Sequence, residues 1–480
     1  MQGTRNYNSK LSSWREKAKK KSKEIAAFKK RMKELIFSRD NWKEKYHAKN
    51  KENKRLKVII EQLKKGSDKE LKNEKKPKHH SYSLQIILLC IWMRQQGNCS
   101  LRSCASTLKI MALVLGLDLK FPSRNTIQNW EKKLGYSRIH RQGKAAEKWV
   151  IILDESISIG QQKLLLILGV ELTKYDFGKA LCFEDTTVLY LGIGKSWTGE
   201  LISKQIKKIK SNGFNIEYGV SDGGTNLIKS LKMSDISLVQ DCTHVIGNLL
   251  KKQYVSNEEF ITFSKQCGVF KRQIMLGKDA LLMPPSQRVK GRFLNLQPLS
   301  SWAYKMLLLL AQKNSKLSKE QQEKLKWLES YRTLILEINE QCKTMNKLFK
   351  ILKNEGLKKE TAEKSKVILE QSKATSFFKD GVRQYLTRNL NILTGNERVI
   401  CCSDIIESYF GKYKNQLEKT GAKLITDSCL AIANFNQKFK KEEIKKAMEE
   451  VKIVDLKNWR QENLPSSLLQ EKRALLKSVG

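Results

Sequence analysis

Between residues 147 and 252, short apolar runs alternate with amphipathic segments. Five runs have the length and hydrophobicity of strands: KWVIIL (148–153), QKLLLILGV (162–170), TTVLYLG (186–192), NIEYGV (215–220) and SLVQ (237–240). Amphipathic segments at about 198–211, 224–233 and 243–252 have helical spacing. The order is three strands, then helix, strand, helix, strand and helix, which predicts an α/β domain with a five-stranded sheet.

After this domain the strand pattern nearly disappears. Residues 253–395 are rich in lysine, glutamate and leucine at helical spacing, which predicts an all-α insertion. Residues 402–419 have a helical pattern, inside a segment, 396–440, that we expect to complete the α/β domain. We expect residues 441–480 to form a basic helical tail.

The N-terminal residues 1–65 show a seven-residue repeat. From Trp14, steps of four and three residues reach mostly apolar positions as far as Leu63. This repeat predicts a left-handed coiled coil, in which Asn53 falls at an a-type position where a buried amide favours a parallel dimer. A single basic helix lying on nucleic acid is the alternative. Residues 66–82 have the composition of a solvated linker.

Residues 83–140 contain three short amphipathic segments. Ser123 is a candidate N-cap for the third, and Arg124, Asn125 and Gln128 follow close to its start. Three short helices with polar residues at the start of the last are typical of a helix-turn-helix-like module that inserts its final helix into a DNA groove. We predict such a DNA-binding domain, with a plain helical dimerisation domain as the alternative.

Composition points to the same kind of partner. The chain of 480 residues has 92 Lys+Arg against 49 Asp+Glu, a formal net charge of +43. This excess favours nucleic acid, although a lysine-rich solvated surface can also produce it. The cysteines form no Cys-x-x-Cys pair, which favours reduced thiols over disulfides or a zinc site. The charged N-terminus and short apolar runs lead us to expect no signal peptide and no membrane span.

Two aspartates follow predicted strands. Asp154 comes directly after the first strand, and Asp222 comes directly after the fourth, in the stretch VSDGG. Strands one and four are expected to be neighbours, so both carboxylates would lie at one edge of the sheet. Two such groups repel each other unless a cation lies between them, and hard divalent ions prefer oxygen ligands. Either aspartate alone is more simply explained as a turn or helix-capping residue.

With these residues, the region 147–420 resembles the catalytic domain of DDE-type DNA transposases. In the hAT and Mutator-like groups and in related bacterial insertion-sequence transposases, one Asp follows strand one and another follows strand four. A Cys or Asp, two residues and a His follow strand five, and a Glu lies on a helix beyond a helical insertion. The matching residues here are Asp154, Asp222, Asp241, His244 and Glu407. The resemblance implies a ribonuclease-H-like core made by 147–252 and 396–440.

The resemblance also implies catalysis with two metal ions. Asp154, Asp222 and Glu407 would hold two Mg²⁺, or Mn²⁺, about 4 Å apart. The reaction would be DNA strand cleavage and strand transfer of a mobile element, with double-stranded DNA of the element's ends and of the target as partners. The protein would act as a homo-oligomer, a dimer through its coiled coil. It would work in the bacterial cytoplasm on nucleoid DNA, or in a eukaryotic nucleus.

Three other functions stay open from the sequence. A domesticated or inactive transposase-derived protein can keep DNA binding without catalysis. A metal-dependent nuclease can cut DNA without strand transfer. A basic coiled-coil scaffold would explain the N-terminal region and little else.

The third carboxylate has a competitor. Asp404 precedes Glu407 by three residues on one predicted helix, so one of them can be the ligand while the other pairs with Lys412 or Lys414. The stretch SYFGKYK after Glu407 favours that residue. His244 would orient a bound phosphate or support the insertion, and a capping or core histidine is the alternative.

A further basic segment lies within the predicted insertion. In SQRVKGRF, basic residues alternate with small or apolar ones. The candidates for phosphate contacts are Arg288, Lys290 and Arg292. A solvated loop is the alternative.

Overall fold

The computed structural model describes most of the chain after residue 75. Its described residues are 76–116, 120–156, 162–287, 293, 296–312, 315–392, 398–420 and 424–466, with scattered residues of 18–57 and 472, 475 and 476. The chain divides into two units, residues 1–75 and 76–480. Every described residue of the first unit is helical. The pairing of the predicted coiled coil at 1–65 is not tested, and most of the linker at 66–82 lies outside the described residues.

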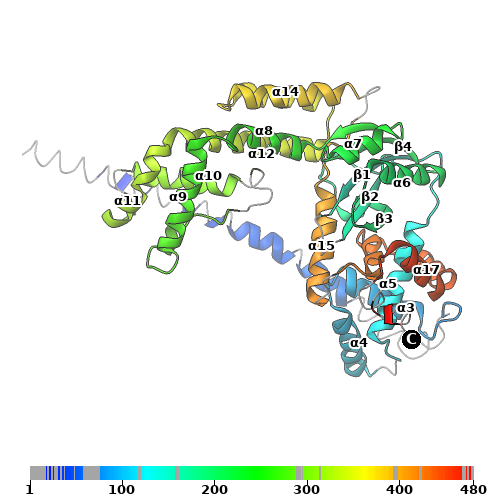
Figure 1. The fold of residues 1–480 in the computed structure, drawn as a ribbon. Helices are drawn as coiled ribbons and strands as arrows, with labels where there is room; N and C mark the ends of the chain where they lie inside the picture. Colours follow the sequence, from blue (N-terminus) through cyan, green and yellow to red (C-terminus); the bar gives the residue numbers. More distant parts are fainter. Residues whose placement is uncertain are drawn as a thin grey trace, which may run out of the picture. The chain divides into compact units, whose positions relative to one another are not determined.

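A five-stranded mixed sheet forms the centre of the second unit (Figure 1). Its strands are β1 (Lys148–Glu155), β2 (Lys163–Glu171), β3 (Thr186–Gly194), β4 (Asn215–Ser221) and β5 (Ser237–Gln240). Their order is β3-β2-β1-β4-β5, in which β2 is antiparallel to both neighbours while β1, β4 and β5 are parallel. The five strands and the neighbouring positions of strands one and four are confirmed. Asp154 lies inside β1 rather than after it, because its pairing with Leu166 continues the β1–β2 ladder.

Alternate residues of the central strands enter two separate cores, as the pleat of a sheet requires. Trp149, Ile151 and Leu153 pack with side chains of α6 (Gly199–Ser211) and α7 (Thr225–Lys232) on one face. Val150 and Ile152 enter the larger core on the other face. That core also takes side chains from α8 (Cys242–Tyr254) and α15 (Asp404–Thr420).

The region between β5 and α15 is helical, as the sequence predicts. After α8 come α9 (Glu258–Ile274), α10 (Leu296–Leu310), α11 (Lys319–Leu325), α12 (Arg332–Glu355), α13 (Lys359–Gln371) and α14 (Ser376–Leu390), with 3-10 turns at Ala280–Leu282 and Lys326–Tyr331. Leu357 and Val399 form an isolated antiparallel bridge through two backbone hydrogen bonds of 2.8 and 2.9 Å. The end of α12 is thereby tied to the segment that leads into α15.

A helical module joins the two ends of the second unit. Its helices are α3 (Leu84–Gln95), α4 (Leu101–Leu115), α5 (Arg124–Ile139), a 3-10 helix at Asp427–Asn434, α16 (Lys441–Glu450) and α17 (Ile453–Asn463). Ile444, Ala447 and Met448 of α16 pack in one core with α3 and α5. The predicted basic tail at 441–480 is therefore helical at its start, and α16 completes the core of this module.

The predicted groove-entering helix α5 is enclosed along most of its length. Ser123 caps it as predicted, because its side chain accepts a hydrogen bond from the Thr126 amide. Near its other end, Arg138 is 4% exposed, pairs with Glu443 at 2.8 Å and donates to the Asn436 side chain. The first turn of α5 is its exposed part.

The close approach of α5 to the 3-10 helix depends on Gly135. A Cβ added to Gly135 would lie 1.9 Å from the backbone oxygen of Leu430, so either backbone would have to move. We expect Gly135→Ala to lower the free energy of unfolding by about 2 to 4 kcal/mol, measured by urea denaturation.

Gly411, in the interior of α15, provides the matched control. Nothing lies within 4 Å of a Cβ built there, so Gly411→Ala should be neutral or stabilise by up to about 1 kcal/mol. Equal stability of the two variants would contradict this account of the α5 contact.

Candidate active site

Asp154 and Asp222 lie side by side because β1 pairs in parallel with β4. Ile152 is opposite Val220 in this ladder, and each aspartate follows its paired residue by two positions. Adjacent strands are about 5 Å apart, and residues two positions apart on a strand point to the same face. Ile152 and Val220 both enter the larger core, so the two carboxylates continue the face on which α8 and α15 lie.

Each of these carboxylates uses one oxygen to accept a hydrogen bond from a nearby backbone amide. Oδ1 of Asp154 accepts a hydrogen bond of 2.7 Å from the Glu155 amide, and Oδ1 of Asp222 accepts one of 2.9 Å from the Gly224 amide. Gly223, which lies between Asp222 and Gly224, has a φ of +86°, a conformation that favours glycine. Asp222 is therefore a turn residue as well. Among the described residues, neither Oδ2 receives a hydrogen bond, which leaves one oxygen of each group for a ligand.

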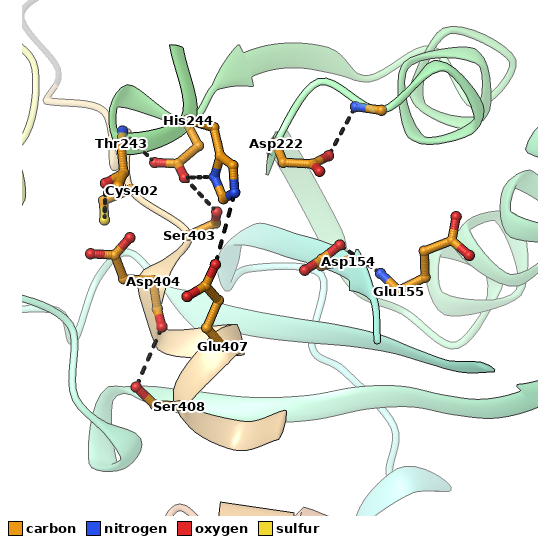
Figure 2. A network of polar contacts seen from close by, with 12 residues as sticks. Asp154, Glu155, Asp222, Thr243, His244, Cys402, Ser403, Asp404, Glu407 and Ser408 are labelled. Atoms are coloured by element: carbon orange, nitrogen blue, oxygen red, sulfur yellow. Dashed lines mark hydrogen bonds and ion pairs between the residues drawn. The ribbon is translucent and has the colours of Figure 1, made fainter. Parts of the chain in front are cut away.

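Glu407 reaches the same space from the first turn of α15. Figure 2 shows its carboxylate directed toward His244, in the space between α15 and the sheet edge that carries Asp154 and Asp222. The segment before α15 is anchored to the sheet and to α8, because the Ile400 amide donates to the Tyr218 hydroxyl at 2.7 Å and the Cys242 amide donates to the Cys401 carbonyl at 2.8 Å. The side chain of Glu407 is 61% exposed.

Asp241 and His244 connect these elements. Asp241 is fully buried at the N-cap of α8 and accepts hydrogen bonds from the Thr243 amide at 3.0 Å and the Ser403 hydroxyl at 3.0 Å. His244 Nδ1 lies 2.6 Å from the carboxylate of Asp241, and His244 Nε2 lies 3.8 Å from Glu407. The predicted supporting residues are thus brought together with the predicted third carboxylate.

The negative charge of Glu407 has a cation close to it, whereas the negative charges of Asp154 and Asp222 do not, within the described part of the chain. Burial, and then the negative charge of Asp222, raise the pKa of Asp154 to about 7. Partial desolvation also raises the pKa of Glu407, whose side chain is 61% exposed, although the charge of His244 opposes this effect. The hydrogen bond to Asp241 raises the pKa of His244 to about 9. The His244 imidazolium therefore faces Glu407, while the strand-end pair has no comparably close cation among the described residues.

Asp404, the competitor for the third carboxylate, has another partner. It forms an ion pair with Lys353 of α12. The expectation that Lys412 or Lys414 would pair with an acid of this helix is wrong for Lys412. Its ammonium instead donates to the Gln95 carbonyl at 3.2 Å and lies over the ring of Phe435, because it points toward the helical module.

The donor atoms of the three candidate catalytic residues are suited to hard divalent cations. All are carboxylate oxygens, the ligands that Mg²⁺ and Mn²⁺ prefer, and the three side chains lie near one edge of the sheet. Asp154, Asp222 and Glu407 therefore fit the ions that the resemblance implies. At least one pair of these three carboxylates has its ligand oxygens more than 4.8 Å apart, because the three do not form a group within that distance.

A second potential ligand cluster was not predicted from the sequence. Within the described part of the chain, Asp241, Cys242 and Cys402 form the group whose ligand atoms all lie within 4.8 Å of one another. All ten cysteines are free thiols. The two thiols come from opposite ends of the helical insertion, so no local motif reveals their proximity. The oxygens of Asp241 already accept hydrogen bonds from three groups.

The predicted DNA-binding residues lie apart from this site. Arg124 and Asn125 are exposed on the first turn of α5, where the Arg124 guanidinium donates to the Asn125 side chain at 3.4 Å, and Gln128 is half-buried. Arg124 and Gln128 line a cavity of about 470 Å³ between α5 and α15. The other candidates, Arg288, Lys290 and Arg292, lie outside the described residues.

Comparison with known proteins gives a distant structural likeness. A chain described as "Drosophila P element transposase strand transfer complex" is similar in structure, with 13% sequence identity and a TM-score of 0.45, over 81% of this chain and 100% of that chain. No protein-family model and no curated protein matches the sequence. In the described residues, every helix is too short or too polar to cross a lipid bilayer.

The contact between Asp241 and His244 predicts a measurable titration. In the native protein His244 should keep its charge at about pH 7.5, because its pKa is raised to about 9. Asp241→Asn removes the carboxylate and should return the pKa toward the ordinary value of 6.5. The measurement is the pH dependence of the histidine Cε1 resonances in ¹³C-histidine-labelled protein, with His244→Gln to assign the signal.

Asp235→Asn is the control, because Asp235 is an exposed residue with no ion pair among the described residues. It should leave the His244 titration unchanged. A His244 pKa that is the same in native protein and Asp241→Asn would contradict the assigned contact.

Proposed function

We propose that this protein is a DDE-type DNA transposase whose sheet and α15 form a ribonuclease-H-like catalytic core. One observation carries the proposal: Asp154 near the end of β1 and Asp222 directly after β4 are placed equivalently by the parallel β1–β4 register, and the Glu407 carboxylate lies in the space beside them (Figure 2). Backbone hydrogen bonds explain the positions of Asp154 and Asp222 singly, but not why three carboxylates from distant elements lie in one region, where their mutual repulsion destabilises the fold. Binding of divalent cations would offset that cost.

Asp154, Asp222 and Glu407 would hold two Mg²⁺ or Mn²⁺ ions, which when bound activate the attacking oxygen and stabilise the leaving oxygen of a phosphodiester. Asp154 and Asp222 are held by their backbone hydrogen bonds and offer one oxygen each. Glu407 has an exposed side chain that can adjust to the bound substrate. His244, held by Asp241, would position Glu407 and keep a positive charge beside the scissile phosphate.

Double-stranded DNA is the proposed substrate. The net charge of +43 favours association with a polyanion, and the contact with phosphates would make the affinity depend steeply on salt. The first turn of α5, with Arg124 and Asn125, would contact DNA at the helical module. Strand transfer requires that a 3′-hydroxyl of cleaved DNA take the place of water as the nucleophile in the same site.

Removal of a strand-end carboxylate should abolish the reaction. Asp222→Asn is expected to lower the rate of Mg²⁺-dependent DNA cleavage by at least about 10³-fold, because a metal site contributes several kcal/mol to the stabilisation of the transition state. The measurement uses labelled duplexes that carry the ends of the element, with Mg²⁺, Mn²⁺ or EDTA. Asp235→Asn makes the same chemical change at an exposed loop and should retain full activity.

The products separate the candidate functions. Joined DNA products in the native protein indicate strand transfer, whereas cleavage without joining indicates a nuclease. Absence of metal-dependent cleavage, with DNA binding retained, would indicate an inactive transposase-derived protein. Equal cleavage by native protein and Asp222→Asn would contradict the assigned site.

We also propose that residues 1–65 form a parallel coiled-coil dimer. The described apolar residues of the repeat are highly exposed in the single chain, at 58% for Met32, 63% for Leu35 and 69% for Trp42. A second helix packed against this seam would bury them in the manner of knobs in holes. A single helix lying on DNA would leave most of them in water.

Disruption of the repeat should therefore change the mass of the protein. Leu35→Glu/Trp42→Glu is expected to convert a dimer to a monomer in light scattering at high salt, as is deletion of residues 1–65. Ile36→Glu introduces a single glutamate one position off the repeat and should leave the dimer intact, whereas Leu35→Glu alone should already weaken it. An unchanged oligomer after deletion of residues 1–65 would contradict the coiled coil.

A further inference from the structure

A second polar cavity lies at the opposite end of β1 from the candidate active site. It has a volume of about 330 Å³ and lies between the end of α5, the start of β1, the β2–β3 connection and the segment before α16. Trp149 lines it from the second residue of β1, and Asp154 lies five residues further along the strand. At about 3.3 Å per residue, the cavity is about 17 Å from the carboxylates.

The cations of this cavity exceed its available anions. Most of the charged lining residues have partners: Arg138 with Glu443 at 2.8 Å, Lys174 with Glu171 at 2.6 Å and Asp185 with Lys179 at 3.0 Å. The remaining basic lining residues are Arg141, Lys438 and Lys440. None of the three has an ion pair with another described residue. The cavity therefore offers three cationic groups with no carboxylate bound to them.

Arg141 is the most constrained of these cations. Its guanidinium donates to the Thr187 hydroxyl at 3.1 Å and lies 5.8 Å from the ring centroid of Trp149. Burial lowers the pKa of Arg141 from its ordinary value, although the charges of Glu443, Glu147 and Glu171 oppose this effect. A partly desolvated cation without a bound anion is destabilising, and a bound anion would offset the cost.

Trp149 adds a donor that lacks an acceptor. The residue is 3% exposed, and its Nε1 is buried without a hydrogen bond to any described residue. A buried indole N–H in a native protein usually has an acceptor, and leaving it unpaired costs about 1 to 3 kcal/mol. An anion with several acceptor oxygens can satisfy the indole, the Thr187 hydroxyl and the cations together.

We propose that this cavity binds a phosphate group. Near neutral pH inorganic phosphate carries one to two negative charges and a phosphodiester carries one, and the tetrahedral oxygens of either group can accept hydrogen bonds from the guanidinium, the two ammonium groups and the indole N–H. The group can belong to the DNA backbone or to a small free phosphate, since the cavity recognises the chemistry that the two share. The site needs neither the carboxylates nor a metal ion, so it does not depend on the proposed catalysis.

The test uses the full chain in EDTA, with inorganic phosphate and a short DNA duplex as separate probes. Lys438→Gln/Lys440→Gln removes two exposed cations of the cavity, and Lys204→Gln/Lys207→Gln removes two exposed lysines of α6 as the matched control. Binding is followed through the indole ¹H–¹⁵N resonance of Trp149, assigned with Trp149→Phe. We expect the ligand to shift this resonance in native protein and control, and its affinity to fall at least tenfold in Lys438→Gln/Lys440→Gln.

The two probes identify the source of the phosphate. If the duplex shifts the Trp149 resonance and the double substitution lowers the salt dependence of binding by about 2 in log–log slope, the ligand is the DNA backbone. If only inorganic phosphate produces the shift, the ligand is a small phosphate. A Trp149 resonance that responds to neither probe, or equal affinities in the two double variants, would overturn the proposal. Loss of DNA cleavage in Asp222→Asn bears on none of these results.

Discussion

The parallel pairing of β1 with β4 is the constraint from which the candidate site follows. Because Ile152 lies opposite Val220, an equal step of two residues brings Asp154 and Asp222 to the same position on neighbouring strands. A shift of one residue in this register would move one carboxylate to the other face of the sheet. The buried aliphatic residues that precede the two aspartates secure the register, so the hydrophobic core also determines the distance between the carboxylates.

Asp241 helps to fix the position of the third carboxylate, Glu407. A fully buried carboxylate is costly unless every oxygen is satisfied, and here the N-terminus of α8, His244 and Ser403 all contribute donors. The N-terminus of α8 follows β5, whereas Ser403 directly precedes α15. One buried charge thereby links the sheet edge to the helix of Glu407, across the long helical insertion. The sequence separation between these residues gives no hint of how near they are in space.

The strands, the helical insertion and the candidate carboxylates could be predicted from the sequence because each has a local signal. Apolar runs indicate the strands, and an acidic residue at the end of a strand indicates the edge of the sheet where the candidate site lies. The enclosure of α5 could not be predicted, since α16, from the other end of the chain, covers it. The same holds for the pairing of Asp404 with Lys353, and for the proximity of Cys242 to Cys402. These contacts depend on packing between distant segments, which periodicity does not encode.

The site combines a rigid half and an adjustable half. Asp154 and Asp222 are short side chains held by backbone amides, and a change of rotamer would break those hydrogen bonds. Glu407 is longer and 61% exposed, so reorientation costs it little more than side-chain entropy. His244 lies beside Glu407 rather than beside Asp154 and Asp222. Its positive charge balances the Glu407 carboxylate when no ligand is bound. In the proposed site, the strand-end pair would fix where a cation binds, while Glu407 would follow the shape of the substrate.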